Sequence, residues 1–219
     1  MKKLPDSEAL RLIKKYKIPF AETLIAKNER QAALYARRIG YPVCLKISSP
    51  DIIHKFDSGA IALGIMDEKS LVEGFRKVVS SAKRKNPKTR IDGVLVQKFV
   101  PNGNATELVV GAKVDPQFGP VVMFGLGGIF VEVMKDVSFR LAPIERKDAQ
   151  EMIREIKGYK ILQGARGRKP ANLKAIEGIL LSVSKMIWAN QKKIRELDLN
   201  PVFADDKKCI AVDIRVMTD

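Results

Sequence analysis

Oxygen-bearing side chains gather near the end of the chain, in two segments that alternate polar and apolar residues. Asp198 and Asn200 share one face of a strand predicted over residues 195–203, because successive strand side chains point to opposite faces. A hairpin symmetric about the turn at 205–208 places Asp213 opposite Asn200. Directly opposed residues have Cβ atoms about 4.5–5.5 Å apart, so two such side chains can hold one divalent cation. Oxygen ligands without histidine or cysteine favour magnesium over zinc, and a solvated strand edge with unrelated acids is the alternative.

A second group of polar residues surrounds His54, the only histidine of the chain. His54 lies in a polar loop between two predicted strands, residues 42–48 and 60–66. On the first strand Lys46 and Ser48 point away from the apolar face, and a lysine in the middle of a buried strand needs an anion. We interpret Lys46 as a phosphate ligand, with a surface lysine that only buries its stem as the alternative. The second strand is predicted to offer a flat ligand one face of small residues, namely Ala60, Ala62 and Gly64.

The elements that must position these residues fall into two groups. An α+β lobe is predicted first, with helices at 7–16, 28–39 and 70–85 and strands at 22–26, 42–48, 60–66 and 92–100. Longer strands follow at 107–114, 120–124, 130–134, 137–141, 195–203 and 209–216, with helices at 146–157 and after Asn172. The glycine-rich run at 125–128 is either a turn or a phosphate contact. The pattern indicates an α+β (α/β) chain in which Glu107 begins the second group of strands.

Composition describes a globular protein of 219 residues, 46% of them hydrophobic and 30% charged. No apolar run reaches the length of a membrane span or a signal peptide, so we expect a cytoplasmic protein. Cys44 and Cys209 lie in apolar runs and are interpreted as buried thiols. A formal charge of +15 favours an anionic partner, but the scattered lysines and sparse aromatics argue against nucleic acid. The abundance of Lys, Arg and Glu also fits a thermophilic source.

Several long motifs, in order, give the chain a family resemblance. They are LKISSPDIIHKFDSG at 45–59, VLVQKFV at 94–100, the segment ELVVGAKVDPQFGPVVMFGLGGIFVEVMKDVSFRLAPI at 107–144, GARGRKP at 164–170 and ELDLNPV at 196–202. Over essentially its whole length the chain resembles the ATP-grasp fold of the nucleoside-diphosphate-forming acyl-CoA synthetases, and most closely the beta subunits of archaeal ADP-forming acetyl-CoA synthetases. The resemblance implies one ATP-grasp domain over 1–219 with nucleotide between two lobes. The smaller lobe would cover about 20–98, and the larger one 99–219 plus the N-terminal helix.

The same resemblance implies roles for individual residues. Lys46 and Ser48 would contact phosphate, and Glu107 would lie near the ribose or the phosphates. The adenine-side strand would contribute Gln97, Lys98, Phe99 and Val100. Magnesium would be bound around Asp198, Asn200 and Asp213. His54 would carry a phosphoryl group, and Glu132 and Arg140 lie in segments that match catalytic ones.

The implied reaction is that of an acid–thiol ligase, which converts acyl-CoA, ADP and phosphate reversibly into free acid, CoA and ATP. His54 would relay the phosphoryl group between ATP or ADP and a separate CoA-binding alpha subunit, in an α2β2 hetero-oligomer. Neutral imidazole suits such a relay because it is nucleophilic near neutral pH. Two other classes stay open: a different ATP-grasp carboxylate–amine ligase, which would not need His54, and a basic nucleic-acid-binding domain.

Overall fold

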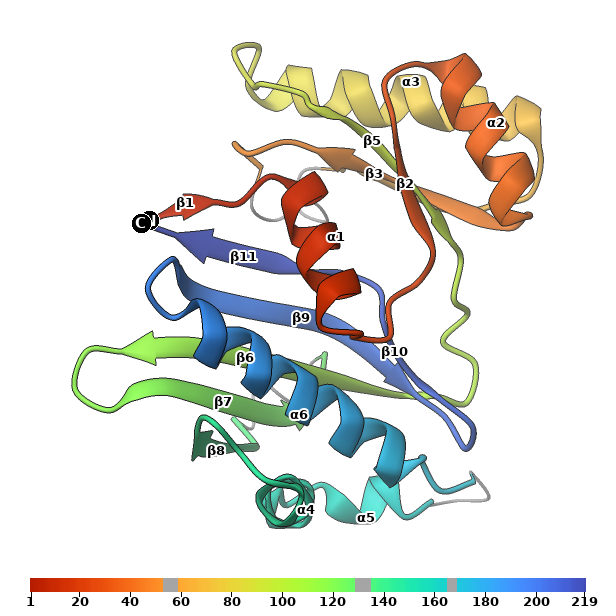
Figure 1. Ribbon diagram of the computed structural model, residues 1–219. Coiled ribbons are helices and arrows are strands. Elements are labelled where there is room, and N and C mark those ends of the chain that lie inside the picture. Colours follow the sequence, from red (N-terminus) through yellow and green to blue (C-terminus); the bar gives the residue numbers. More distant parts are fainter. Residues whose placement is uncertain (53–58, 129–134, 165–168) are drawn as a thin grey trace. The chain divides into compact units, whose positions relative to one another are not determined.

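The computed structural model describes residues 1–52, 59–128, 135–164 and 169–219. The described chain divides into two compact units. Unit 1 comprises Met1–Lys2, Ala9–Phe20 and Asn102–Asp219, and unit 2 comprises Lys3–Glu8 and Ala21–Pro101. Each unit combines a largely antiparallel sheet with helices (Figure 1), so the predicted α+β class is confirmed. Within the described ranges, every helix is too short or too polar to span a membrane.

Unit 2 is built on a four-stranded antiparallel sheet in the order β2-β5-β3-β4. Its strands are β2 (Thr23–Ala26), β3 (Val43–Ser48), β4 (Ile61–Ile65) and β5 (Gly93–Lys98), and its helices are α2 (Glu29–Ile39) and α3 (Glu68–Lys85). Polar caps begin both helices: the Asn28 side chain accepts a hydrogen bond from the Gln31 amide, and Asp67 accepts one from the Ser70 amide. The apolar faces of the two helices and of the sheet form one core.

Alternation along β3 follows the sequence prediction. Val43, Leu45 and Ile47 are fully buried in the core shared with α2 and α3. Lys46 and Ser48 therefore lie on the opposite face of the sheet, because strand side chains alternate. Both remain largely shielded from water, with 6% and 1% of their surfaces exposed.

The prediction for β4 is wrong about which face carries the small residues. Ala60 and Ala62 pack into the core with α3, where a Cβ added to Gly74 would lie 3.6 Å from the Ala62 Cβ. Small residues are therefore required on this face for close packing of the helix, and not for a flat ligand. Ile61 pairs with Lys46 across the strands and shares the face of the lysine.

An irregularity in the pairing of β3 with β4 explains the error. The register shifts between Val43 and Leu45 on β3. On β4, Gly64 adopts a positive φ of 65°, a conformation that glycine reaches without steric cost. Beyond Gly64, Ile65 lies in the core with 6% of its surface exposed. A simple period of two over residues 60–66 cannot describe a strand that contains such an irregularity.

Unit 1 contains a seven-stranded sheet in the order β1-β11-β9-β6-β7-β8, with β10 also paired to β9. The strands are β1 (Lys2–Lys3), β6 (Thr106–Asp115), β7 (Gly119–Leu126), β8 (Val137–Leu141), β9 (Ile194–Ala204), β10 (Cys209–Ala211) and β11 (Arg215–Thr218). The strand predicted over 209–216 is thus two strands, separated at 212–214. The strand predicted over 130–134 lies outside the described residues.

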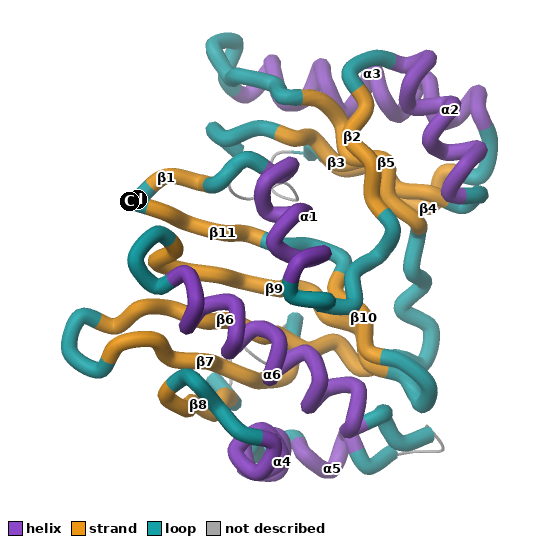
Figure 2. Tube along the Cα trace, viewed as in Figure 1, coloured by secondary structure: helices purple, strands orange, loops and turns teal. Residues whose placement is uncertain are grey.

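The helices of unit 1 are α1 (Asp6–Lys15), which begins in unit 2, α4 (Arg146–Glu155), α5 (Tyr159–Leu162) and α6 (Leu173–Asn190). The long helix α6 packs along β6, β7 and β9 (Figure 2). Its buried side chains include Ile176, Ile179, Leu180, Val183 and Ile187. The strands that α6 packs along also contain fully buried residues, among them Leu108, Val110, Phe124 and Leu199. The residues between these on β6 and β9 lie on the other face of the sheet, which carries Glu107 and Asp198.

Candidate functional site

The C-terminal hairpin has the predicted register on both sides of its central gap. Ala211 pairs with Val202 in β10, and Arg215 pairs with Asp198 in β11. Between these pairs, the Val212 amide donates to the carbonyl oxygen of Pro201 at 3.1 Å. One continuous register thus runs through the gap and places Asp213 opposite Asn200, as the sequence predicted. That these residues bind magnesium stays a prediction.

Asp198 lies on the face of the sheet opposite α6. It pairs with Gly111 of β6, which alternates with residues buried on the α6 side. The Arg215 guanidinium lies 3.7 Å from the Asp198 carboxylate and 2.7 Å from that of Glu196. All three side chains are about one third exposed or less, so solvent screens these ion pairs only in part. Arg215 thus partly balances the negative charge beside Asn200 and Asp213.

The hairpin offers magnesium an appropriate but incomplete set of ligands. The described residues contain no group of three His, Cys, Asp or Glu side chains that is arranged to hold a metal. Magnesium usually takes only one or two protein carboxylates, with phosphate oxygens and water completing its octahedron. Asp198, Asn200 and Asp213 fit that mode, because each provides oxygen ligands and the nucleotide would supply the rest.

Glu107 lies on the same face of unit 1, against the glycine-rich run. The Gly127 amide donates to the Glu107 carbonyl oxygen at 2.8 Å, and a Cβ at Gly127 would lie 2.8 Å from the Glu107 Cγ. Gly128 follows with a positive φ of 60°. These two glycines therefore leave space for the Glu107 side chain. Burial raises the pKa of its carboxyl above the usual range.

Two of the four nucleotide candidates at the end of β5, Gln97 and Lys98, make side-chain hydrogen bonds within unit 2. The Gln97 amide nitrogen donates to the Thr23 hydroxyl at 2.8 Å. Lys98 donates to the carbonyl oxygens of Gly40 and Tyr41, and so stabilises the C-terminal end of α2. Phe99 and Val100 follow and are partly exposed. Gln97 and Lys98 therefore have structural roles within unit 2. Contact of this strand with a nucleotide stays a prediction.

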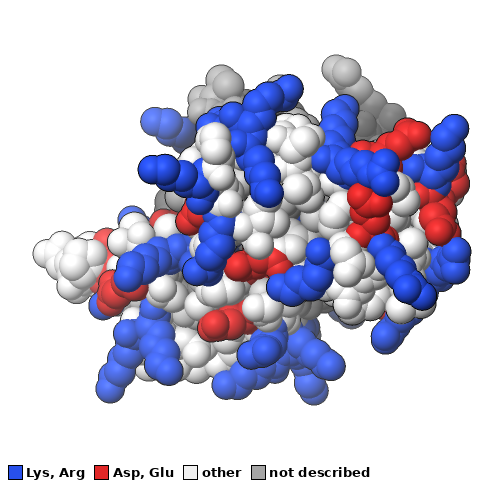
Figure 3. All heavy atoms as spheres, turned by 90° about the horizontal axis from the view of Figure 1, so that it is seen from above, with Lys and Arg blue, Asp and Glu red and all other residues white. Residues whose placement is uncertain are grey.

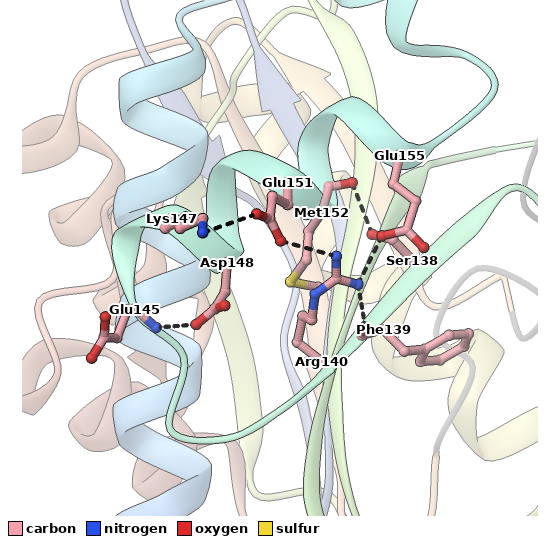
Figure 4. A network of polar contacts seen from close by, with 9 residues as sticks. All are labelled: Ser138, Phe139, Arg140, Glu145, Lys147, Asp148, Glu151, Met152 and Glu155. Atoms are coloured by element: carbon pink, nitrogen blue, oxygen red, sulfur yellow. Dashed lines mark hydrogen bonds and ion pairs between the residues drawn. The ribbon is translucent and has the colours of Figure 1, made fainter.

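Arg140 lies in a network of polar contacts between β8 and α4 (Figure 4). Its Nη1 donates to Glu155 at 2.7 Å, and its Nη2 lies 3.6 Å from Glu151. The hydrogen bond to Glu155 raises the pKa of the guanidinium. Ser138 shares this face of β8 and donates to the Met152 carbonyl oxygen at 2.9 Å. These contacts attach α4 to β8, and a catalytic role for Arg140 remains a prediction.

The other two catalytic candidates, His54 and Glu132, lie outside the described residues. Asp136 was missed by the sequence analysis, although it is buried just beyond the segment that contains Glu132. Its two carboxylate oxygens accept hydrogen bonds from the amides of Lys157 and Gly158, each at 2.7 Å. No periodicity or spacing predicts this contact, because its partners are backbone groups about twenty residues away.

The basic charge does not form one continuous patch on the surface in Figure 3. Lys and Arg side chains there are interspersed with acidic and neutral ones. On α2 and α3 of unit 2, Arg37 pairs with Glu68 and Arg76 pairs with Glu29. This distribution differs from the basic stripe that is typical of a nucleic-acid interface.

Comparison with known proteins identifies the class. The model of the ATP-grasp domain family matches residues 1–218, and the chain belongs to this family. It is 47% identical to the protein of Pyrococcus furiosus named ADP-forming acetate–CoA ligase I subunit beta, over 98% of this chain and 91% of that one. It is 48% identical to the ADP-forming acetate–CoA ligase I of Archaeoglobus fulgidus, over 96% of this chain but only 30% of that longer one.

Solved structures of one further relative agree with this assignment. The acetyl-coenzyme A synthetase 1 of Ca. Korarchaeum cryptofilum, in complex with coenzyme A and Ca-AMPCP, superimposes with a TM-score of 0.95 at 43% identity. The match covers 100% of this chain and 94% of that one. A second structure of that enzyme contains coenzyme A and Mg-AMPPCP, and its phosphohistidine segment is described as pointing towards the nucleotide-binding site. It superimposes with a TM-score of 0.85 at 39% identity, covering 100% of this chain and 93% of that one.

Proposed function

We propose that this chain is the nucleotide-binding beta subunit of an ADP-forming acyl-CoA synthetase. The observation that carries the proposal is similarity at 47% identity to a protein of that name, over nearly the full length of both chains. The reaction is acyl-CoA plus ADP and phosphate to carboxylic acid, CoA and ATP, and it is reversible. The chain is thereby an acid–thiol ligase that handles the nucleotide half of the reaction, and a cytoplasmic location is proposed with it.

Each unit contributes its own nucleotide-binding residues to this proposal. In unit 2, Lys46 and Ser48 are assigned to phosphate, and the strand end at 97–100 to the adenine side. In unit 1, Glu107 is assigned to the ribose or the phosphates. The hairpin residues Asp198, Asn200 and Asp213 are assigned to magnesium, which would neutralise phosphate charge when bound.

His54 is assigned as the phosphoryl acceptor. A neutral ring nitrogen attacks the terminal phosphorus of ATP, the bond from phosphorus to the bridging oxygen breaks, and ADP leaves. In the direction of ATP synthesis the same bonds form and break in reverse. Glu132 and Arg140 are proposed as assisting residues. For Arg140 this role must be compatible with its ion pairs to Glu151 and Glu155.

The partner is proposed to be a separate CoA-binding alpha subunit in an α2β2 assembly. Two findings support this division: the Pyrococcus relative is named a subunit, and this chain covers only 30% of the longer Archaeoglobus ligase. Mixing this chain with the alpha subunit from the same cell and measuring the mass of the complex by light scattering tests the stoichiometry. A complex of one copy of each chain would contradict α2β2.

Two measurements test the proposed function as a whole. ATP with magnesium should raise the melting temperature, because a ligand at 100 times its dissociation constant adds about 2.7 kcal/mol to the stability. The mixture with the alpha subunit should then form ATP from acetyl-CoA, ADP and phosphate. A nucleic-acid-binding domain would show neither effect. A carboxylate–amine ligase would show the first effect without the second.

Lys46→Met is expected to weaken ATP binding by about 1.5–3 kcal/mol, or roughly 10- to 150-fold, because one charge-assisted phosphate contact is lost while the aliphatic stem remains. Isothermal titration with ATP and magnesium measures the effect. Lys77→Met, which removes an exposed lysine of α3 in the same unit, is the matched control and should bind as the wild type does. Equal affinity in the Lys46 and Lys77 variants would remove Lys46 from the nucleotide site.

A further inference from the structure

The ammonium group of Lys3 is buried in unit 2 among three acceptors. Its Nζ donates to the carbonyl oxygen of Ser49 at 2.9 Å and to that of Ile52 at 3.2 Å. The Asp6 carboxylate lies 3.4 Å away, and the Lys3 and Asp6 side chains are only 2% and 4% exposed. Two of its three N–H donors thus go to backbone carbonyl groups, and the Asp6 carboxylate lies within ion-pair distance. The arrangement is a specific binding site for one lysine, unlike the exposed Lys2 beside it.

The two carbonyl groups that Lys3 binds belong to the turn that follows β3. Neighbouring contacts fix the same turn: the Ser48 carbonyl oxygen accepts from the Asp92 amide at 2.8 Å, and Asp51 accepts from the Arg90 amide at 2.7 Å. The Lys3 contacts fix Ser49 and Ile52, so backbone carbonyl groups are held at 48, 49 and 52 and a side chain is held at 51. His54 is two residues beyond Ile52 in the sequence.

Stability alone does not explain why an ion pair lies at this place. Removing two charges from water costs several kcal/mol, and well-packed apolar residues of similar volume are often equally stable or more stable. A lysine bound to two backbone carbonyl groups, however, fixes the course of the chain in a way that an apolar side chain cannot. The position of the turn bears directly on where the chain enters the segment that contains His54.

We propose that Lys3, through its bonds to the Ser49 and Ile52 carbonyl groups, is a positioning residue for phosphoryl transfer. It fixes the turn at 49–52, and with it the point from which His54 reaches the transferred phosphoryl group. The inference rests on the proposed function of His54. Because misplacement of a reacting group by about 1 Å can cost roughly 100-fold in rate, loss of the Lys3 contacts should slow phosphorylation without weakening nucleotide binding.

The test uses variants that separate positioning from stability. Lys3→Met alone removes the cation beside the buried Asp6 carboxylate, and breaking a buried ion pair in this way is strongly destabilising. The double variant Lys3→Met/Asp6→Leu removes both charges and restores an apolar site. Asp6→Asn keeps Lys3 on both carbonyl groups, and Lys2→Met changes an exposed neighbour. The full chain is used with its alpha subunit, and single-turnover phosphorylation of His54 is followed over a range of ATP concentrations.

The double variant should fold, and its phosphorylation should reach half the maximal rate at the same ATP concentration as in the wild type. The maximal phosphorylation rate itself should be lower by about 10- to 100-fold. Asp6→Asn and Lys2→Met should keep rates within about twofold of the wild type. Phosphorylation of His54 at the wild-type rate in a folded double variant would overturn the positioning role of Lys3 but not the proposed function. The same conclusion would follow if only the half-saturating ATP concentration changed in the double variant. A wild-type protein that never phosphorylates His54 overturns this role together with the proposed function.

Discussion

Replacing His54 by alanine should abolish acyl-CoA-dependent ATP formation, with a loss on the order of 10³-fold or more, because removal of a covalent acceptor eliminates the intermediate itself. The prediction is motivated by the resemblance of SPDIIHK, residues 49–55, to the phosphohistidine segment expected in the family. The measurement is the rate of ATP synthesis from acetyl-CoA, ADP and phosphate, with the alpha subunit in excess. His54→Asn, which retains a polar side chain without a nucleophilic ring, should lose as much.

The chemistry of the phosphorylated chain provides an independent check. A phosphoryl group on nitrogen should survive alkali and be lost in acid, whereas an ester on Ser48, Ser49 or Ser58 would show the reverse. Labelled ATP with magnesium should therefore give an acid-labile mark in the wild type and none in His54→Ala. If the alanine variant makes ATP at the wild-type rate, the relay through His54 is wrong.

The sequence predicted best those features that local rules determine. The register of the C-terminal hairpin followed from the turn at 205–208, where the Asp205 carboxylate accepts hydrogen bonds from the Lys207 and Lys208 amides. Alternation along β3 was equally predictable, because an unbroken strand alternates its faces strictly. The ATP-grasp family itself followed from long motifs in a fixed order, and the match over residues 1–218 confirms it.

Contacts between distant residues could not be predicted in this way. Lys3 and Ser49 are 46 residues apart, and Gln97 and Thr23 are 74 apart. Neither pair leaves a periodic signal, because each depends on how whole elements pack. The small face of β4 was assigned wrongly for a related reason: alternating small residues can accommodate a helix or a ligand equally well, and the close approach of Gly74 on α3 is a contact between distant residues.

The opposition of Asn200 and Asp213 permits a selective test of the magnesium site. Asp213→Asn retains the size of the side chain and an oxygen ligand but removes the negative charge that attracts the cation. Loss of a supporting group at a metal site typically costs 10- to 100-fold in metal affinity, so loss of this carboxylate should weaken magnesium-dependent ATP binding by at least about 10-fold. Titration of magnesium at fixed ATP, followed calorimetrically, measures the change.

The matched control is Asp206→Asn, which removes an exposed acid from the turn of the same hairpin. Asp206 pairs with Lys169 at 2.9 Å, an exposed contact that contributes little to stability. Both variants should keep the wild-type fold without nucleotide, because neither changes a residue of the sheet core. Only Asp213→Asn should need more magnesium, since only Asp213 lies opposite Asn200. An equal increase of the magnesium requirement in the two variants would mean that general negative charge on the hairpin attracts magnesium. An unchanged magnesium requirement in Asp213→Asn would remove this residue from the metal site.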